Sequence, residues 1–559
     1  MASDNTLVTF RNPVITGFNP DPTVCVVPAS ETSPTTFFLS TSTFELFPGC
    51  AIYTSTNLLD WTLIGHALTR RSQIEMRTVE PGAGSWASTL RYRASEKRWY
   101  LANGLFQRYR PTVDERIFPR GFYVWTDNIW DDAAWSDPVY FDNPGFDQDL
   151  FWDDDGKVYL STTMRLAWRD PDSKLKDFSI HISEIDIKTG RTLTAPRSIR
   201  ESPHGIAEGS HIIKRGEYYY LFTAEGGTEA GHQEWVLRNR EGPYGPWEGQ
   251  GKPLWYNGPE EEVQRTGHAD VFEDGDGQWW AVLLGVRPFN NGGTFWEPPL
   301  GRETFLVTVD WLDNWPVFNG GKNITLETQG RASLSRTEKL GPTVWRADLS
   351  KESLELGWYQ KNTPLKQSYS LTERPGFLRL YGNCYNLSSP EAPAMLLRKQ
   401  TSYSQTFFAS MEFAPTRRGY EAGVVLWWSN YSYATIGVVA TQKDSGVQHD
   451  VVLRRPGGND RIIWSLPFPS QQSAKLDFEI RAGPVLYEMY ISSNTDKLSQ
   501  AIATNELTVA PPVGGAFTGV MFGIYSFGKG EPVLDPADFT DISSVDHDVL
   551  DRDVRWDRR

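Results

Sequence analysis

The chain has 559 residues, of which 39% are hydrophobic and 22% charged, and its formal net charge is −15 at pH 7. This length exceeds what one hydrophobic core usually organises, so we expect two domains. The negative charge argues against nucleic acids and anionic membrane surfaces as partners, because both attract basic proteins. No apolar run approaches the roughly 18 residues of a membrane-spanning helix, and three cysteines are too few for a disulfide framework.

Short apolar and aromatic runs beside turn residues follow one another through about the first 310 residues. Examples are TFFLS at 36–40, WYLA at 99–102, VYLST at 158–162, YYYLFT at 218–223 and WWAVLL at 279–284. Segments with helical periodicity are scarce, so the pattern predicts an all-β fold. A propeller of small four-stranded sheets fits such strands, but no repeat of fixed period is visible, and a sandwich or a barrel fits nearly as well.

A change in composition near 311–345 predicts the boundary between the two domains. This stretch is rich in Gly, Asn and other turn residues. We therefore expect a first domain over 1–330 and a second over 331–559. Longer alternating strands are predicted in the second domain at 377–382, 406–415, 422–428, 433–440, 476–482 and 485–492. Such alternation is typical of an antiparallel sandwich.

Three acidic residues stand in unusual contexts. Asp21 lies between two prolines that restrict the backbone, although the same residues would also suit a plain turn at the start of a strand. Asp147 lies among apolar residues just before a strand, where it could be buried beside other carboxylates. Glu208 lies in a loop that leads to the strand near Tyr218, and partial burial there would raise its pKa. Hydrolysis of a glycosidic bond requires such carboxyl groups, one as an acid and one as a base or nucleophile.

The high aromatic content has two interpretations. The chain has 22 Trp, 23 Tyr and 29 Phe. Aromatic side chains pack well in sheets, and flat rings also stack on the C–H faces of sugars.

Several further segments, in order along residues 12–320, resemble the family 43 glycoside hydrolases, which are five-bladed propeller enzymes that attack xylans and arabinans. They are STFELFPG at 42–49, YTSTNLLDW at 53–61, WASTLRY at 86–92, TAEGGT at 223–228, GPYGPW at 242–247, GHAD at 267–270 and LGRET at 300–304. The region after 345 resembles the C-terminal, concanavalin-like β-sandwich of one branch of that family. The resemblance thus implies a five-bladed propeller followed by a β-sandwich.

The resemblance also implies roles for the three acids in an inverting reaction. Asp21 would be the general base that activates water, Glu208 the general acid, and Asp147 the residue that raises the pKa of the acid and orients it. Inversion requires about 6.5–9.5 Å between the base and acid carboxyls. No cofactor is expected for this chemistry.

Four other residues receive expected roles from the resemblance. Phe44, Trp86 and Arg287 would line the sugar pocket, although a salt bridge elsewhere is an alternative for Arg287. His268 would lie near the propeller axis, where a structural calcium ion is expected.

The sequence departs from the family pattern beside two of the acids. Ser210 replaces the usual proline two residues after Glu208, and Gln148 and Asp149 replace the usual proline and serine after Asp147. Asp149 is therefore a rival to Asp147. We prefer Asp147, because Phe146 before it and the Leu-Phe pair after it fix its register.

The expected activity is release of α-L-arabinofuranosyl residues from arabinoxylan side chains. The alternatives are a β-D-xylosidase acting on xylo-oligosaccharides, a bifunctional enzyme, or an inactive carbohydrate-binding protein. No Gly-x-Ser-x-Gly motif supports a serine hydrolase. In the sandwich, Trp427 and Trp428 could bind polysaccharide, but buried packing is the expected role of most aromatics there. The resemblance implies an extracellular protein, although the N-terminus MASDNTLVTFRNP shows no signal peptide.

Overall fold

The computed structural model describes residues 7–107, 120–165, 176–331, 334, 343–444, 446–457, 461–465, 475–493, 497–510 and 517–547. The chain divides into two compact units. The first, the propeller unit, comprises Met1–Pro288 and Arg302–Thr337. The second, the sandwich unit, comprises Phe289–Gly301 and Glu338–Arg559. In the described part of the chain, no helix is long and apolar enough to cross a membrane.

The propeller unit contains five four-stranded sheets, each a meander of antiparallel strands. The first sheet consists of β2 (Thr23–Val27), β3 (Thr36–Thr41), β5 (Gly49–Ser55) and β6 (Thr62–Leu68). The second consists of β7 (Gly84–Arg93), β8 (Arg98–Phe106), β9 (Arg120–Thr126) and β10 (Val139–Pro144). The third consists of β11 (Phe146–Trp152), β12 (Val158–Arg165), β13 (Phe178–Ile185) and β14 (Arg197–Glu201).

The fourth and fifth sheets of the propeller unit have the same four-stranded form. The fourth consists of β15 (Ala207–Arg215), β16 (Tyr218–Glu225), β17 (Gln233–Asn239) and β18 (Glu248–Gly249). The fifth consists of β19 (Gln264–Glu273), β20 (Trp279–Val286), β23 (Glu303–Leu312) and β24 (Trp315–Phe318). Shorter elements of the unit are β4 (Leu46–Phe47) and the 3₁₀ turns η1 (Asp132–Ala134) and η2 (Asn319–Gly321). All five strand-length runs expected from the sequence fall in β3, β8, β12, β16 and β20, which confirms the all-β prediction.

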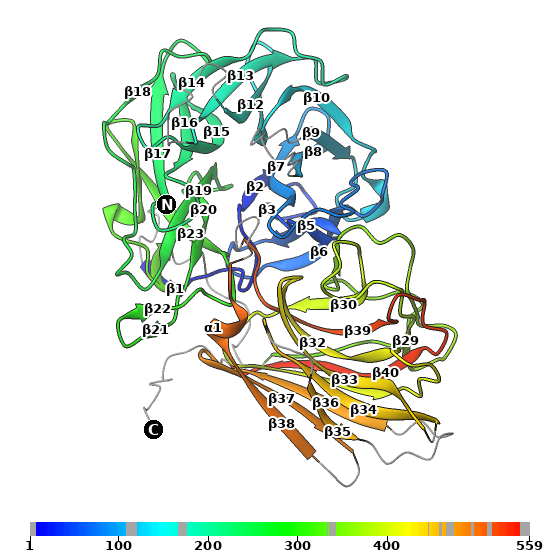
Figure 1. Ribbon diagram of the computed structural model, residues 1–559. Coiled ribbons are helices and arrows are strands. Elements are labelled where there is room, and N and C mark those ends of the chain that lie inside the picture. Colours follow the sequence, from blue (N-terminus) through cyan, green and yellow to red (C-terminus); the bar gives the residue numbers. More distant parts are fainter. Residues whose placement is uncertain are drawn as a thin grey trace. The chain divides into compact units, whose positions relative to one another are not determined.

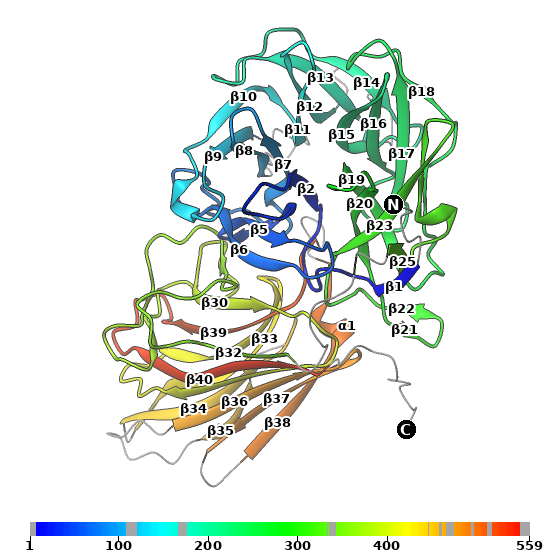
Figure 2. The same ribbon diagram turned by 180° about the vertical axis from the view of Figure 1, so that it is seen from behind.

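The five sheets are the blades of a closed propeller. The first strand of each blade contacts the first strand of the next, in the order β2, β7, β11, β15, β19 and back to β2. These strands therefore line the axis, while the later strands of each blade lie farther out (Figures 1 and 2). Between neighbouring blades the interior is apolar; the cluster between the first and second blades, for example, contains Phe38, Ile52, Leu90, Leu101 and Val124.

The two ends of the propeller unit pair with each other. Strand β1 (Leu7–Arg11) pairs antiparallel with β25 (Glu327–Arg331). The Asn12 side chain, which is fully buried, donates to the Leu306 carbonyl at 2.8 Å and to the Thr328 hydroxyl at 2.9 Å. The start of the unit is thus hydrogen-bonded to its last blade and to the segment that follows it.

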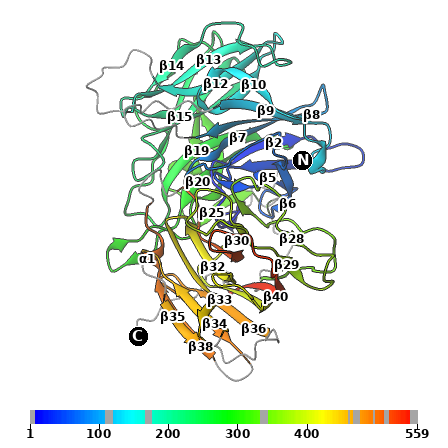
Figure 3. The same cartoon turned by 45° about the vertical axis from the view of Figure 1, so that its right-hand side comes forward.

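The sandwich unit contains two large antiparallel sheets (Figure 3) and the small hairpin β21–β22. The larger sheet consists of β26 (Thr343–Arg346), β28 (Tyr369–Ser370), β29 (Leu378–Leu380), β31 (Gln405–Glu412), β36 (Lys475–Ala482), β37 (Leu486–Ser492), β38 (Lys497–Ala503) and β40 (Ala537–Asp546). The smaller sheet consists of β30 (Ala394–Lys399), β32 (Glu421–Ser429), β33 (Ser432–Lys443), β34 (Gly446–Arg454), β35 (Arg461–Ser465) and β39 (Met521–Phe527). The remaining elements are β21 (Asn290–Asn291), β22 (Thr294–Phe295), β27 (Gln360–Lys361) and the one-turn helix α1 (Thr504–Leu507).

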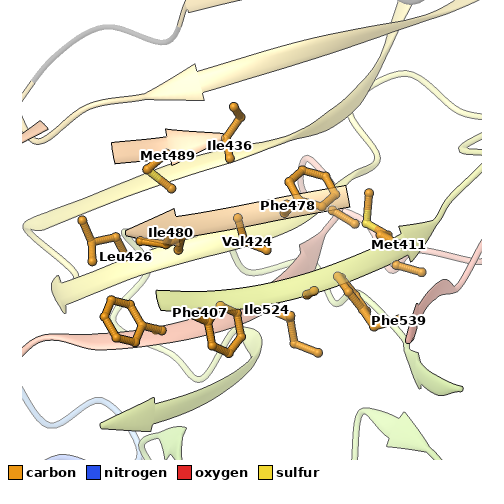
Figure 4. Packing of buried hydrophobic residues seen from close by; sticks show 14 of the residues in the cluster. Phe407, Met411, Val424, Leu426, Ile436, Phe478, Ile480, Met489, Ile524 and Phe539 are labelled. Atoms are coloured by element: carbon orange, nitrogen blue, oxygen red, sulfur yellow. The ribbon is translucent and has the colours of Figure 1, made fainter. Parts of the chain in front are cut away.

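Alternating side chains of the two sheets form one apolar core. Phe407, Met411, Phe478 and Ile480 come from the larger sheet, and residues such as Val424 come from the smaller one (Figure 4). This is the in-out alternation expected from the sequence. Trp427 and Trp428 are only 2% and 1% exposed, so packing, and not polysaccharide binding, is their role in this structure.

Candidate active site

Each inner strand of the propeller carries a kink at the same place. One residue with a positive φ lies just before β2 and one lies within the first half of each other inner strand: Asp21 (52°), Ala87 (27°), Asp147 (54°), Gly209 (58°) and His268 (54°). In four of the five strands the pairing register also shifts across this residue, as in a β-bulge. A bulge re-aims side chains, and a left-handed backbone at a non-glycine residue costs about 1–3 kcal/mol. The five kinks, 66, 60, 62 and 59 residues apart, are a structural repeat that the sequence does not show as a motif.

Asp21 is a buried carboxylate held by three side chains. The Ser42 hydroxyl donates to one oxygen at 2.6 Å, and Arg302 donates to the other at 3.1 Å. His268 Nδ1 lies 3.5 Å from that second oxygen. Burial opposes ionisation, but Arg302, His268 and Ser42 together lower the pKa of Asp21 below its usual value. Asp21 is therefore ionised at neutral pH, as a general base must be.

Asp147 is buried beside the other two acids. One of its oxygens accepts a hydrogen bond of 2.9 Å from the Gly209 backbone N–H. Burial, and then repulsion from Glu208 and Asp21, raise the pKa of Asp147 well above its usual value. Gly209 serves this contact in a second way, since a Cβ on it would lie 2.9 Å from the His268 ring. A side chain at position 209 would thus displace His268 or the backbone that binds Asp147.

Glu208 directly precedes this glycine at the start of β15 and remains partly accessible to solvent. Burial raises the pKa of Glu208 to about 7; Asp21 raises it too, while Lys176 and Arg302 lower it. Because Glu208 and Asp147 repel each other when both are ionised, the two carboxyls titrate as a pair. A carboxyl with a pKa near 7 can donate a proton at neutral pH.

Asp149, the rival of Asp147, makes different contacts. It lies 2.9 Å from Arg91 Nη2, accepts a 3.0 Å hydrogen bond from the Ile212 N–H, and is 1% exposed. Burial opposes its ionisation, but Arg91 lowers the pKa of Asp149 below its usual value. It is a structural ion-pair partner, and the geometry favours Asp147 as the neighbour of Glu208.

Phe44 and Trp86 contact each other, and each also lies near a neighbour of the acids, Arg302 for Phe44 and Phe146 for Trp86; their pocket-lining role stays a prediction. Their ring centroids are 5.9 Å apart, and the Arg302 guanidinium lies 5.1 Å from the Phe44 ring. Trp86 stacks on Phe106 at 3.8 Å, and its indole N–H donates to the Gly82 carbonyl at 2.9 Å. These contacts fix the orientation of the indole ring.

The arginine that contacts a catalytic candidate is Arg302, which binds Asp21 and was not predicted from the sequence. Besides Asp21 it binds the Thr228 hydroxyl at 2.9 Å, and its side chain is 8% exposed. Arg287, the residue expected in the pocket, forms a two-pronged ion pair with Glu303 at 2.6 and 2.9 Å, and Glu303 in turn binds the Gly17 N–H. The LGRET segment at 300–304, which resembles the family and contains Arg302, could have indicated this residue from the sequence.

His268 is buried between Asp21 and His211, whose ring lies 5.8 Å away. Burial lowers the pKa of His268 to about 3, so the ring is neutral at physiological pH. Calcium prefers six to eight oxygen ligands. Within the described ranges, no three His, Cys, Asp or Glu side chains gather as metal ligands, and Asp21 is already paired with Arg302. The described side chains around His268 therefore do not fit the calcium site that the resemblance led us to expect there.

Two family models match the chain. Residues 10–316 match "Glycosyl hydrolases family 43", and residues 346–543 match "Beta xylosidase C-terminal Concanavalin A-like domain". The matches fall on the propeller unit and the sandwich unit.

Known proteins resemble the chain over nearly its whole length. The "Non-reducing end alpha-L-arabinofuranosidase BoGH43B" of Bacteroides ovatus is 33% identical over 95% of this chain and 94% of its own. The solved structure "Bacteroides ovatus Xyloglucan PUL GH43B" has a TM-score of 0.80 at 31% identity, with 97% of this chain and 100% of that one covered. The xylan β-1,4-xylosidase of Bacillus halodurans has a TM-score of 0.83 at 26% identity, with 96% and 99% covered.

Proposed function

Because the chain belongs to family 43 of the glycosyl hydrolases, we propose that it releases α-L-arabinofuranosyl residues from arabinoxylan side chains and inverts the anomeric configuration. The observation that supports this proposal best is the opposite shift of two carboxyl pKa values at one site. The pKa of Asp21 is lowered, and that of Glu208 is raised to about 7. Such a split supports Asp21 as the base and Glu208 as the acid.

The three acids have separate roles in the proposed reaction. The ionised Asp21 accepts a proton from a water molecule as the water attacks the anomeric carbon. Glu208 donates its proton to the glycosidic oxygen, so the leaving sugar departs as a neutral alcohol. Repulsion between Asp147 and Glu208 disfavours ionisation of both together, and the bond of Asp147 to the Gly209 N–H fixes it next to the acid. Arg302 keeps Asp21 ionised.

The arabinofuranosyl substrate is supported by the arabinofuranosidase relative, which is similar along both domains. Release of xylose from xylo-oligosaccharides is the second candidate. It is supported by the xylosidase structure from Bacillus halodurans and by the name of the C-terminal domain family. One enzyme could perform both reactions.

Proton NMR of arabinoxylan during digestion tests the proposal. We expect wild type to release arabinose first as the β-anomer, the inverted product. Glu208→Ala should release none, whereas Glu217→Ala, which changes an exposed glutamate of the same blade, should match wild type. First appearance of the α-anomer would exclude inversion.

The other outcomes of the same digestion separate the alternatives. Xylose without arabinose would replace the first candidate by the xylosidase. No product from arabinoxylan, xylo-oligosaccharides or arabinosylated xyloglucan fragments would leave a carbohydrate-binding protein as the best account. Action outside the cell is part of the proposal and is checked by assaying the culture medium of the native host against its cells.

A further inference from the structure

A second layer of polar residues lies next to the catalytic layer along the propeller axis. In four blades, a side chain two residues after the kink belongs to it: Thr23, Asp149, His211 and Asp270. The remaining inner strand, β7, contributes Arg91.

Arg91 contacts all four of these side chains. Its Nη1 lies 2.8 Å from Asp270 and 3.3 Å from the Thr23 hydroxyl. Its Nη2 lies 2.9 Å from Asp149 and 3.1 Å from His211 Nδ1. Since a guanidinium only donates, Nδ1 of His211 accepts and Nε2 carries the proton. One side chain therefore joins the inner strands of all five blades.

The charges of this layer depend on Arg91. Asp149 and Asp270 have side chains 1% and 3% exposed, and Arg91 is 17% exposed. Asp270 also accepts from the Thr23 hydroxyl and the Val24 N–H, and Asp149 from the Ile212 N–H. Even so, Arg91 is the cation that both carboxylates contact. Without it, two buried carboxylates would face each other with no positive charge between them.

The same contacts connect Arg91 to the acids. Asp149 is two residues from Asp147. His211 is two residues from Gly209, whose N–H binds Asp147. Asp270 is two residues from His268, which lies 3.5 Å from Asp21. A shift of any of these strands therefore moves a catalytic carboxyl or its partner.

We propose that Arg91 is the resident cation of the propeller axis, in a place where two carboxylates would otherwise call for a metal ion, and that it is a positioning residue for the catalytic layer. It does not contact the three acids itself among the contacts described here. It acts by holding the inner strands at a fixed spacing. The inference about catalysis rests on the proposed roles of Asp21, Asp147 and Glu208, whereas the inference about the cation does not.

Metal analysis of the purified wild type tests whether Arg91, and not a metal ion, is the cation at the axis. Thermal unfolding with and without a chelator is the second test. We expect no stoichiometric calcium and an unchanged unfolding temperature. A bound calcium ion whose removal lowers the unfolding temperature would overturn the proposal.

The positioning role is tested with Arg91→Ala, Arg91→Lys and the control Arg98→Ala, which removes an arginine of the same blade that is paired with Asp127. A misplacement of about 1 Å can cost about 100-fold in rate, so we expect kcat of Arg91→Ala to fall about 100-fold with KM nearly unchanged. Millimolar guanidinium chloride, compared with equal sodium chloride, should restore part of the activity and raise the unfolding temperature of Arg91→Ala. Arg98→Ala should keep the wild-type kcat.

Arg91→Lys keeps the charge but not the fork that spans two carboxylates, so it should fold and lose about tenfold in kcat. If Arg91→Ala does not fold, the kcat of Arg91→Lys tests the positioning role by itself. Wild-type kcat in Arg91→Lys, or a loss expressed in KM alone, would overturn the positioning role. If the wild type hydrolyses no glycoside, the proposed function fails, while metal content and guanidinium-dependent stability still decide whether Arg91 is the axial cation.

Discussion

The centre of the propeller and the centre of the sandwich are built on opposite principles. The sandwich core is apolar, and alternating strands supply residues such as Phe478 and Val424 to it. The propeller axis is lined by carboxylates, an arginine and histidines on kinked strands. All but two of the non-glycine residues with positive φ in the described chain lie in the propeller unit, the exceptions being Asn362 and Asp541. The difference shows that the propeller axis combines kinked backbone with buried carboxylates where chemistry is proposed, while the centre of the sandwich is stabilised by ordinary apolar packing.

The largest expected effect comes from removing the acid at the axis. Glu208→Ala should lower kcat on arabinoxylan by roughly 10²–10⁴-fold, the usual contribution of a general acid. The loss should be smaller on a dinitrophenyl arabinofuranoside, whose leaving group needs no proton. Steady-state kinetics on both substrates checks this, and equal losses on both would contradict the role of acid. The unfolding temperature should not fall, because removing this partly buried carboxyl relieves its repulsion with Asp147.

The matching change in the sandwich should affect stability. Phe478→Ala removes a fully buried ring from the core and should lower the free energy of unfolding by about 3–5 kcal/mol. Denaturant unfolding followed by fluorescence measures it. Val485→Ala, at a site 38% exposed, is the control and should change little. Similar losses for both variants would mean that this core is not the main source of stability in the sandwich unit.

The acid limb of the pH profile should respond to Arg302. Arg302 helps to lower the pKa of Asp21, and the base must be ionised, so activity is lost as the pH falls through that pKa. Arg302→Met removes the positive charge, raises the pKa of Asp21 and should move the acid limb of kcat/KM to higher pH by about one unit. An acid limb at the wild-type position would show that Arg302 does not control the ionisation of Asp21.

The basic limb should respond to Asp147 and not to Asp149. The pKa of Glu208 is about 7, so activity should fall as the pH rises through about 7. Asp147→Asn removes a neighbouring carboxylate, lowers the pKa of Glu208 and should move this limb to lower pH. Asp149→Asn weakens the pair with Arg91 and should lower stability and kcat without moving this limb. Near-normal activity with an unmoved limb in Asp147→Asn would overturn the preference for Asp147.

The smallest effect is expected at the outer surface of a blade. Asp127→Asn breaks an exposed pair with Arg98, and exposed pairs contribute about 0–1 kcal/mol. Thermal unfolding of Asp127→Asn and of Asp270→Asn compares the loss of a surface ion pair with the loss of an axial one. We expect the unfolding temperature to fall much more for Asp270→Asn. Equal losses would show that burial at the axis gives its ion pairs no special weight.

The sequence predicted those parts of the structure that depend on local pattern. Alternation and turn residues placed strands in both units, and the resemblance identified Asp21, Asp147 and Glu208, which the structure brings together. The backbone conformation of Ala87 or His268 could not be predicted, because a left-handed non-glycine residue is imposed by its surroundings. Arg91 and Arg302 were missed because their partners are distant in sequence, such as Asp270 for Arg91 and Asp21 for Arg302. Arg302 lies within the LGRET segment and Arg287 outside it, and only their contacts show that Arg302 binds Asp21 while Arg287 pairs with Glu303.

The pairing of β1 with β25 has a consequence for the timing of synthesis. The partner of Leu7 is Arg331, which is made more than 300 residues later. At about 5–20 residues per second, the N-terminal strand waits roughly 15–60 s before its partner emerges. During that interval its backbone groups and Phe10, which is buried in the finished unit, lack their final neighbours. A ribosome stalled before residue 327 would therefore hold a nascent chain whose first strand is open to proteases and chaperones.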